Sequence, residues 1–264
     1  MKEYSASSAS EIELKLLITH PDPGEIWRDI EDLKPLEGYS LLPENKLHLR
    51  DVYFDTTDGL LQKNKLALRL RTQNRDQLIT LKGNKKIRDN GAIHRLEIER
   101  AWSHPFLNEI IKVISASIPA FKFAPFDFLT DHPMQTLEGL GLQSIQERTT
   151  HRIVRLFTDQ LSDSLIAEGA LDETVFKLAN ESIHHYELEI ELKGKGTDQD
   201  LQQIKTALLS AYPESLETWF ISKLELGMML EKVIGEPAFR KFLEKNNRIS
   251  REGYQYLKKE YKYS

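Results

Sequence analysis

Hydrophobic and polar residues alternate along several short stretches, and this period of two is the pattern of β-strands. In the stretch 11–16, Glu11, Glu13 and Lys15 share one face, while isoleucine and leucine side chains form the other. Arg69 and Arg71 alternate with leucines in the same way. We therefore predict strands that each have one charged and one apolar face. They cover residues 11–18, 52–55, 66–71, 77–82, 95–99, 144–157, 165–171 and 186–193.

Apolar residues at helical spacing lie between these groups of strands. The predicted helices cover residues 26–33, 105–117, 198–212 and 219–233, with one or two more within 237–259. This order predicts an α+β fold, in which helices pack outside a curved antiparallel sheet. If the helices cover the apolar faces, the charged faces line the concave side of a barrel or tunnel. We predict a disordered N-terminus (1–10), a main domain (11–227) and a helical C-terminal extension (228–264).

Composition narrows the class of protein. A hydrophobic fraction of 40% and a charged fraction of 29% over 264 residues are typical of a soluble globular chain. The net charge of −5 argues against general nucleic-acid binding, which needs a broad basic surface. The absence of cysteine excludes disulfides, thiolate metal sites and a cysteine nucleophile. With no long apolar run and no signal-like start, we expect no membrane partner and a cytoplasmic location.

Charged side chains that line an enclosed space require partners, because removing an ion from water costs several kcal/mol. Glutamates at alternating positions offer the hard oxygen ligands that Mg²⁺ or Mn²⁺ accepts. Arginine and lysine side chains bind phosphate oxygens. Together the two sets indicate a metal-bound polyphosphate ligand. Either set alone is also typical of a solvated surface.

The run Glu11-Ile12-Glu13-Leu14-Lys15 resembles the E-x-E-x-K signature of the CYTH superfamily, the triphosphate tunnel metalloenzymes. Further matches follow in the family's order and extend the resemblance over residues 11–230. They are Tyr53-Phe54-Asp55-Thr56, Leu68-Arg69-Leu70-Arg71, Thr80-Leu81-Lys82, Arg95-Leu96-Glu97, Ala170-Leu171-Asp172, Glu187-Leu188-Glu189-Ile190-Glu191 and Ser222-Lys223-Leu224-Glu225.

The resemblance implies an eight-stranded antiparallel tunnel that processes a triphosphate with Mg²⁺ or Mn²⁺. Its metal ligands would be Glu11, Glu13, Glu187, Glu189 and Asp172. Its phosphate-binding residues would be Lys15, Arg69, Arg71, Lys82, Arg95, Arg152 and Lys223. Its catalytic residues would be Glu11, Glu13, Lys15, Arg69 and Arg71. Arg148 is a further candidate, and Glu97 and Asp172 could coordinate metal or orient the basic residues.

Within the superfamily, the chain is most similar to the bacterial inorganic triphosphatases, so the expected reaction is hydrolysis of tripolyphosphate to pyrophosphate and phosphate. The alternatives are a nucleoside or thiamine triphosphatase, a class IV adenylyl cyclase, and a non-catalytic polyphosphate-binding module. We expect a small-molecule substrate, no nucleic-acid partner, and a monomer or homodimer. His184 and His185 are adjacent on a strand and face opposite ways, so we do not expect them to bind one metal.

Overall fold

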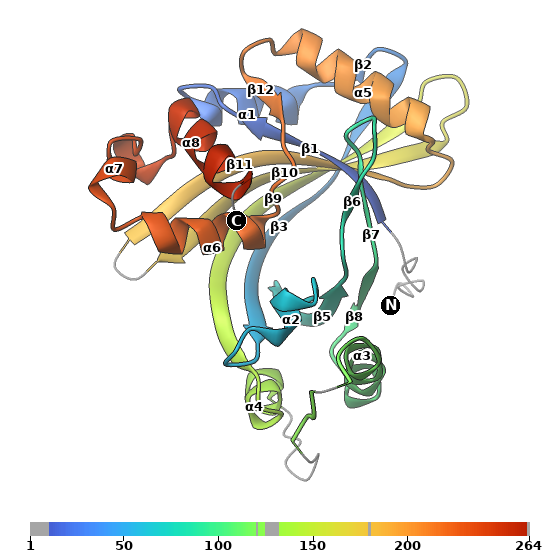
Figure 1. The fold of residues 1–264 in the computed structure, drawn as a ribbon. Coiled ribbons are helices and arrows are strands. Elements are labelled where there is room, and N and C mark those ends of the chain that lie inside the picture. Colours follow the sequence, from blue (N-terminus) through green and yellow to red (C-terminus); the bar gives the residue numbers. More distant parts are fainter. Residues whose placement is uncertain (1–10, 120, 125–131, 179–180, 263–264) are drawn as a thin grey trace. The chain divides into compact units, whose positions relative to one another are not determined.

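The structure, a computed structural model, describes residues 11–119, 121–124, 132–178 and 181–262. The predicted disorder of residues 1–10 lies outside this part of the chain. The fold is α+β, with one large antiparallel sheet and helices (Figure 1). The helices are α1 (Pro23–Asp32), α2 (Leu60–Lys63), α3 (His104–Ser117), α4 (Pro133–Gly139), α5 (Asp198–Ala211), α6 (Lys223–Val233), α7 (Pro237–Arg240), the 3-10 helix η1 (Lys245–Asn247) and α8 (Arg251–Lys262).

The sheet contains twelve strands, paired in the order β6-β7-β1-β11-β10-β9-β3-β4-β5-β8, with β12 beside β1 and β2 beside β3. The expected closed barrel of eight strands is not confirmed, because β6 and β8 end this order without pairing to each other in the described residues. The strands are β1 (Glu11–Ile18), β2 (Pro35–Leu36), β3 (Tyr39–Asp55), β4 (Ala67–Gln73), β5 (Asp76–Lys82), β6 (Lys86–Ile87), β7 (Ile93–Arg95), β8 (Glu97–Ala101), β9 (Gln143–Asp159), β10 (Leu165–Leu178), β11 (Glu181–Leu192) and β12 (Leu216–Thr218).

Most predicted elements are present, but several strands are longer than predicted: β3 begins at Tyr39 rather than at residue 52, and β10 ends at Leu178 rather than at residue 171. Two further elements differ for local reasons. The predicted strand 95–99 is divided at Leu96 into β7 and β8. The predicted helix 219–233 is wrong in its first turn, because α6 begins only at Lys223. Ser222 caps α6 by accepting a hydrogen bond from the Glu225 amide, and the Glu225 carboxylate accepts one from the Ser222 amide. Residues 219–222 form neither helix nor strand: β12 ends at Thr218, and the Trp219 amide donates to the Lys15 carbonyl at 2.9 Å.

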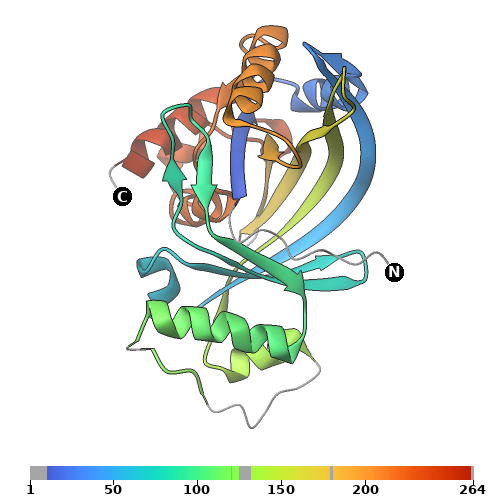
Figure 2. The same cartoon turned by 90° about the vertical axis from the view of Figure 1, so that its right-hand side faces the viewer.

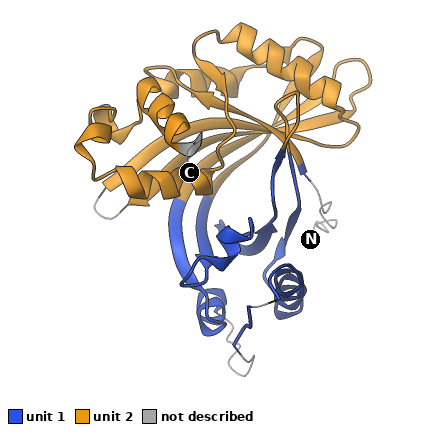
Figure 3. Ribbon diagram, viewed as in Figure 1, with its two compact units in different colours: residues 1–11, 49–86, 94–148 blue, residues 12–48, 87–93, 149–264 orange. Residues whose placement is uncertain are grey.

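The chain divides into two compact units, each built from several segments (Figure 3). Unit 1 comprises residues 1–11, 49–86 and 94–148. In unit 1, the apolar face of β4 and β5 packs against α3, and Figure 2 shows this helix running along those strands. Ile110 and Ile114 of α3 meet Leu68 and Ile79 in this core.

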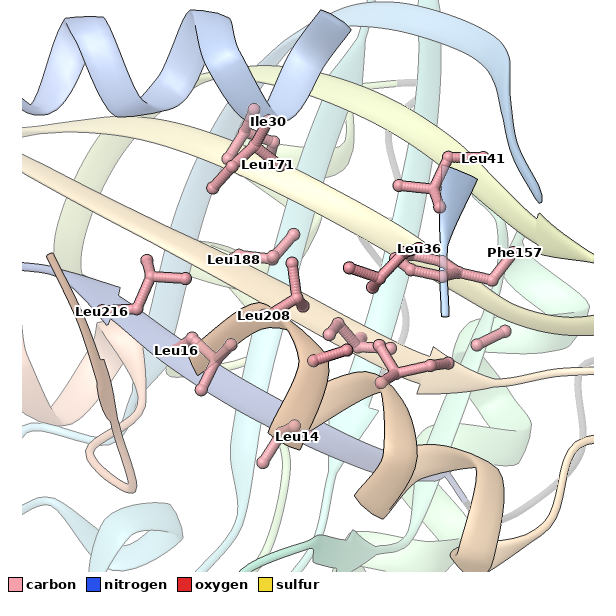
Figure 4. Close-up of a cluster of buried hydrophobic side chains, with 14 of the residues drawn as sticks. Leu14, Leu16, Ile30, Leu36, Leu41, Phe157, Leu171, Leu188, Leu208 and Leu216 are labelled. Carbon is pink, nitrogen blue, oxygen red and sulfur yellow. The ribbon is translucent and has the colours of Figure 1, made fainter. Parts of the chain in front are cut away.

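Unit 2 comprises residues 12–48, 87–93 and 149–264, and its helices cover both faces of its strands. On the apolar face, α1 and α5 bury side chains such as Leu14, Leu16 and Leu188 (Figure 4). A second core contains residues of α6 and α8 together with Leu17 of β1 and Phe176 of β10. By alternation these two residues share a face with Lys15 and Asp172. The expectation that all helices pack on the apolar side is therefore wrong for α6 and α8.

Candidate functional site

Three carboxylates from two neighbouring strands of unit 2 come together on the charged face. Asp172 on β10 lies directly opposite Glu187 on β11, and Glu189 follows two residues later on the same face. One oxygen from each of the three lies within 4.8 Å of the others. Like charges placed opposite each other destabilise a sheet. This arrangement therefore requires compensating cations, which the same unit supplies.

Three cations surround these carboxylates. Arg152 forms a bidentate pair with Asp172, at 2.7 and 2.6 Å, and donates to Glu189 at 2.8 Å. Lys223 Nζ lies 2.9 Å from oxygens of both Asp172 and Glu189, and it also pairs with Glu187. Lys15 pairs with Glu189, lies 3.7 Å from Glu187, and lies 3.6 Å from Glu13. We call this group the carboxylate cluster; it comprises Glu13, Lys15, Arg152, Asp172, Glu187, Glu189 and Lys223.

Two glutamates of the carboxylate cluster, Glu187 and Glu189, are ionised at neutral pH. Burial alone would raise the pKa of Glu187, but the charges of Lys223 and Lys15 outweigh it and lower this pKa to about 2. The pKa of Glu189 is held well below its usual range, because the cations Lys15, Lys223 and Arg152 outweigh its burial. Both glutamates therefore present anionic oxygens.

The cluster contains four carboxylates and three cations, so it carries a net negative charge. Hard anionic oxygens at this spacing are the donor set that Mg²⁺ or Mn²⁺ accepts. The residues present therefore fit a divalent metal, with Asp172, Glu187 and Glu189 as its ligands. Lys15 connects Glu13 to these ligands, because its Nζ lies 3.6 Å from a Glu13 carboxylate oxygen. In this structure the lysine and arginine side chains offset most of the carboxylate charge.

Unit 1 contains a second charged group, centred on Asp51 of β3. Asp51 accepts two hydrogen bonds from Arg71, at 2.7 and 2.9 Å, and contacts Arg69 at 3.5 Å and Arg148 at 3.3 Å. Burial would raise the pKa of Asp51, but the charges of Arg71 and Arg69 hold it well below its usual range. Arg69 also donates to Glu99 at 2.7 Å. One carboxylate therefore holds three buried guanidinium groups side by side.

The remaining predicted residues of unit 1 join the same group. Lys82 Nζ lies 2.7 Å from Glu97 and 3.4 Å from Glu11, and Arg95 pairs with Glu11. We call this group the arginine cluster, and it carries five cations against four carboxylates. Its members are Glu11, Asp51, Arg69, Arg71, Lys82, Arg95, Glu97, Glu99 and Arg148.

The structure thus distributes the predicted residues over two groups. Glu13, Lys15, Arg152, Asp172, Glu187, Glu189 and Lys223 meet in unit 2, and Glu11, Arg69, Arg71, Lys82 and Arg95 meet in unit 1. Glu11 contacts cations of unit 1, whereas Glu13, two residues later, contacts Lys15 of unit 2. Each residue's functional role stays a prediction.

Sequence reasoning missed two polar residues that hold these groups. Asp51 lies two residues before Tyr53, so in a strand the two side chains share a face. This position on the charged face was the signal that could have identified Asp51. His185 is fully buried and donates from Nε2 to the Glu187 carboxylate at 2.8 Å. The expectation that the two histidines face opposite ways is confirmed, because His184 contacts Glu173 instead.

A cavity of about 750 Å³ lies elsewhere in unit 2, between the segments 31–35, 40–46 and 153–155. It contains none of the predicted site residues. Arg155 lines it and donates to the carbonyls of Leu33 and Leu41, both at 2.7 Å, so this arginine ties two segments together. Within the described ranges, none of the helices has the length and apolar character needed to span a membrane.

Comparisons with known proteins agree with the pattern of residues. A family model described as the CYTH domain matches residues 9–218. A search of curated proteins gave no match. Among solved structures, the adenylyl cyclase candidate HpAC1 from Hippeastrum, described as having a dominant triphosphatase activity, has a TM-score of 0.53 at 16% identity. The alignment covers 83% of this chain and 95% of that one, and it shows a shared fold.

Two other solved structures have lower similarity. A proposed adenylate cyclase from Bacillus halodurans has a TM-score of 0.47 at 18% identity, over 83% of this chain and 98% of that one. The Mimivirus capping enzyme triphosphatase has a TM-score of 0.40 at 12% identity, over 78% of this chain and 90% of that one.

Proposed function

Because the chain belongs to the CYTH domain family, we propose that it is a metal-dependent hydrolase of triphosphates, with inorganic triphosphate as its substrate. The observation that carries this proposal is the carboxylate cluster, where three acidic side chains converge within 4.8 Å among three cations. The closed eight-stranded tunnel remains part of the proposal and rests on the family resemblance alone.

In this proposal Asp172, Glu187 and Glu189, with Glu13, hold Mg²⁺ or Mn²⁺. A bound divalent ion would polarise a phosphoryl oxygen as a Lewis acid. Lys15 and Lys223 keep Glu187 and Glu189 ionised and donate to phosphate oxygens. A carboxylate oxygen of the cluster accepts a hydrogen bond from the attacking water and orients it. No nucleophilic side chain is needed, which agrees with a chain that has no cysteine.

The arginine cluster supplies the other phosphate-binding groups. Arg69 and Arg71 are held by Asp51 with their guanidinium groups already ordered, so a phosphate that binds them pays little side-chain entropy. The cluster's excess of positive charge favours a polyanion. Arginine forks match phosphate oxygens in pairs and stabilise charge on the phosphoryl group during transfer.

The tryptophans give no support for a nucleotide substrate. A base would need an accessible aromatic face to stack on. Trp219 is fully buried, and Trp27 and Trp102 are partly buried and pack against the cores of their own units. Each of the three thus has a packing role, and none is needed for an inorganic substrate.

Phosphate release from tripolyphosphate tests the proposal. Glu13→Gln should lose most of the activity seen with Mg²⁺ or Mn²⁺, because it removes an anionic ligand. Glu173→Gln is the matched control: Glu173 lies next to Asp172 in sequence but faces His184 and Tyr186. We expect the control to retain the parent's activity.

The same experiment separates the alternatives. Faster phosphate release from ATP or thiamine triphosphate than from tripolyphosphate would indicate a nucleoside or thiamine triphosphatase. Cyclic AMP formation from ATP would indicate a cyclase. If tripolyphosphate binds tightly but no triphosphate is hydrolysed with either metal, the chain is a polyphosphate-binding module and the enzyme proposal fails.

A further inference from the structure

The C-terminal helix α8 reaches the carboxylate cluster through two buried side chains. His185 of β11 contacts the Tyr254 hydroxyl through Nδ1 at 2.9 Å and the Glu187 carboxylate through Nε2 at 2.8 Å. His185 is fully buried, and Tyr254 is 4% exposed. A continuous chain of hydrogen bonds therefore links α8 to a carboxylate of the proposed metal site.

The chemistry of the three groups determines the direction of both hydrogen bonds. Ionised Glu187 only accepts, so His185 must donate to it from Nε2. A neutral imidazole then has an acceptor at Nδ1, and the Tyr254 hydroxyl donates to it.

The protein holds Tyr254 firmly in this position. Arg251 and Lys258, which lie on either side of Tyr254 along α8, both pair with Glu217 of β12, at 2.8 and 3.0 Å. The Tyr254 ring packs edge-on against Trp219, with ring centroids 5.5 Å apart. At Gly253, an added Cβ would lie 2.8 Å from Ile249 and 2.9 Å from Phe242. The helix is therefore tightly packed beside the tyrosine.

We infer that Tyr254 and His185 are positioning residues of the carboxylate cluster, through which the C-terminal extension orients Glu187 for metal binding. Tyr254 selects the His185 tautomer, and His185 engages Oε2 of Glu187. The other oxygen, Oε1, is then directed toward Lys223 and the neighbouring carboxylates. Outer hydrogen bonds of this kind commonly change metal affinity or activity by about 10 to 100-fold. The inference rests on the proposed function for its metal, but the hydrogen-bond chain itself does not.

The test compares two substitutions that each remove one hydroxyl from α8. Tyr254→Phe breaks the contact with His185, whereas Tyr256→Phe changes a half-buried ring that packs against Phe239 and Phe242. Calorimetric titration with Mn²⁺, without triphosphate, should show affinity lowered by about 10-fold for Tyr254→Phe only. For tripolyphosphate hydrolysis, kcat should fall while KM changes little, because Tyr254 reaches the cluster through His185 and Glu187 rather than through the proposed phosphate-binding lysines. Equal Mn²⁺ affinity and kcat in the two variants would overturn the inference.

Nitrogen-15 NMR of labelled histidine gives a readout that is independent of metal and activity. The His185 signal, identified by its loss in His185→Gln, should show the tautomer protonated at Nε2, and Tyr254→Phe should shift its Nδ1 resonance. A ring protonated at Nδ1 in the parent refutes the inference. If the parent binds no Mn²⁺ or hydrolyses no triphosphate, the proposed function fails while the NMR result still decides whether the chain orients Glu187.

Discussion

Substituting Asp51 by asparagine removes the charge that holds three buried arginines together in unit 1. Asp51 is 1% exposed and accepts a bidentate pair from Arg71, with contacts to Arg69 and Arg148. Removing one partner of a buried ion pair typically costs about 3 to 5 kcal/mol. An asparagine keeps one acceptor oxygen but turns an amide donor toward a guanidinium. We therefore expect Asp51→Asn to lower the free energy of unfolding by about 3 kcal/mol.

Urea denaturation followed by circular dichroism measures this loss, and hydrogen exchange of peptides within 49–86 locates it in unit 1. Asp76→Asn is the control: Asp76 is exposed in the same unit, so its loss should change stability by less than about 0.5 kcal/mol. Tripolyphosphate should stabilise Asp51→Asn more than the parent, because a bound anion replaces the missing charge. A loss below about 1 kcal/mol for Asp51→Asn would refute the view that Asp51 organises the arginine cluster.

Three further substitutions test separate features. Burial would raise the pKa of Glu99, but Arg69 and Arg71 lower it from 4.5 to about 2, so its contribution to stability is present above pH 4.5 and is lost as pH falls toward 2. The unfolding free energies of Glu99→Gln and the parent should thus differ by about 1 to 2 kcal/mol at pH 7, given its partial exposure, and converge near pH 2. Ser222→Ala removes the α6 cap and should lower the free energy of unfolding, measured by urea denaturation, by about 1 kcal/mol. It should also raise KM for tripolyphosphate, because Lys223 is the first residue of that helix. An unchanged KM would show that the cap does not position Lys223 for substrate binding. Gly169→Ala places a Cβ 2.7 Å from the buried Phe157 ring and should lower the unfolding free energy by about 1 to 3 kcal/mol, whereas a stabilised variant would show that the ring can move.

The sequence pattern identified strands whose two faces differ strongly, because alternation alone determines which side chains share a face. It placed Lys15 opposite Leu14 and Leu16 correctly, and both faces are buried in the structure. The pattern could not predict which charged side chains form ion pairs. Glu11 and Glu13 share a face of one strand, yet they contact cations of different units. Such contacts depend on which distant strands meet, and no local period encodes that.

Two other features were missed for physical reasons. A serine cap can begin a helix at any of several positions in an apolar run, so the start of α6 was predicted too early. Tyr254 lies in a helix rich in lysine and tyrosine, where its spacing marks only a buried stripe. Its role depends on His185, which precedes it by 69 residues.

The pairing of β1 with β11 has a consequence for synthesis of the chain. Lys15 and its partner Glu189 are separated by 174 residues, so β1 leaves the ribosome long before β11 exists. At translation rates of about 5 to 20 residues per second, this interval lasts roughly 10 to 35 seconds. During it, the apolar side of β1 has no strand partner from β11 or β12 and is exposed to chaperones or to other nascent chains. The carboxylate cluster is therefore completed only after most of the polypeptide has been made.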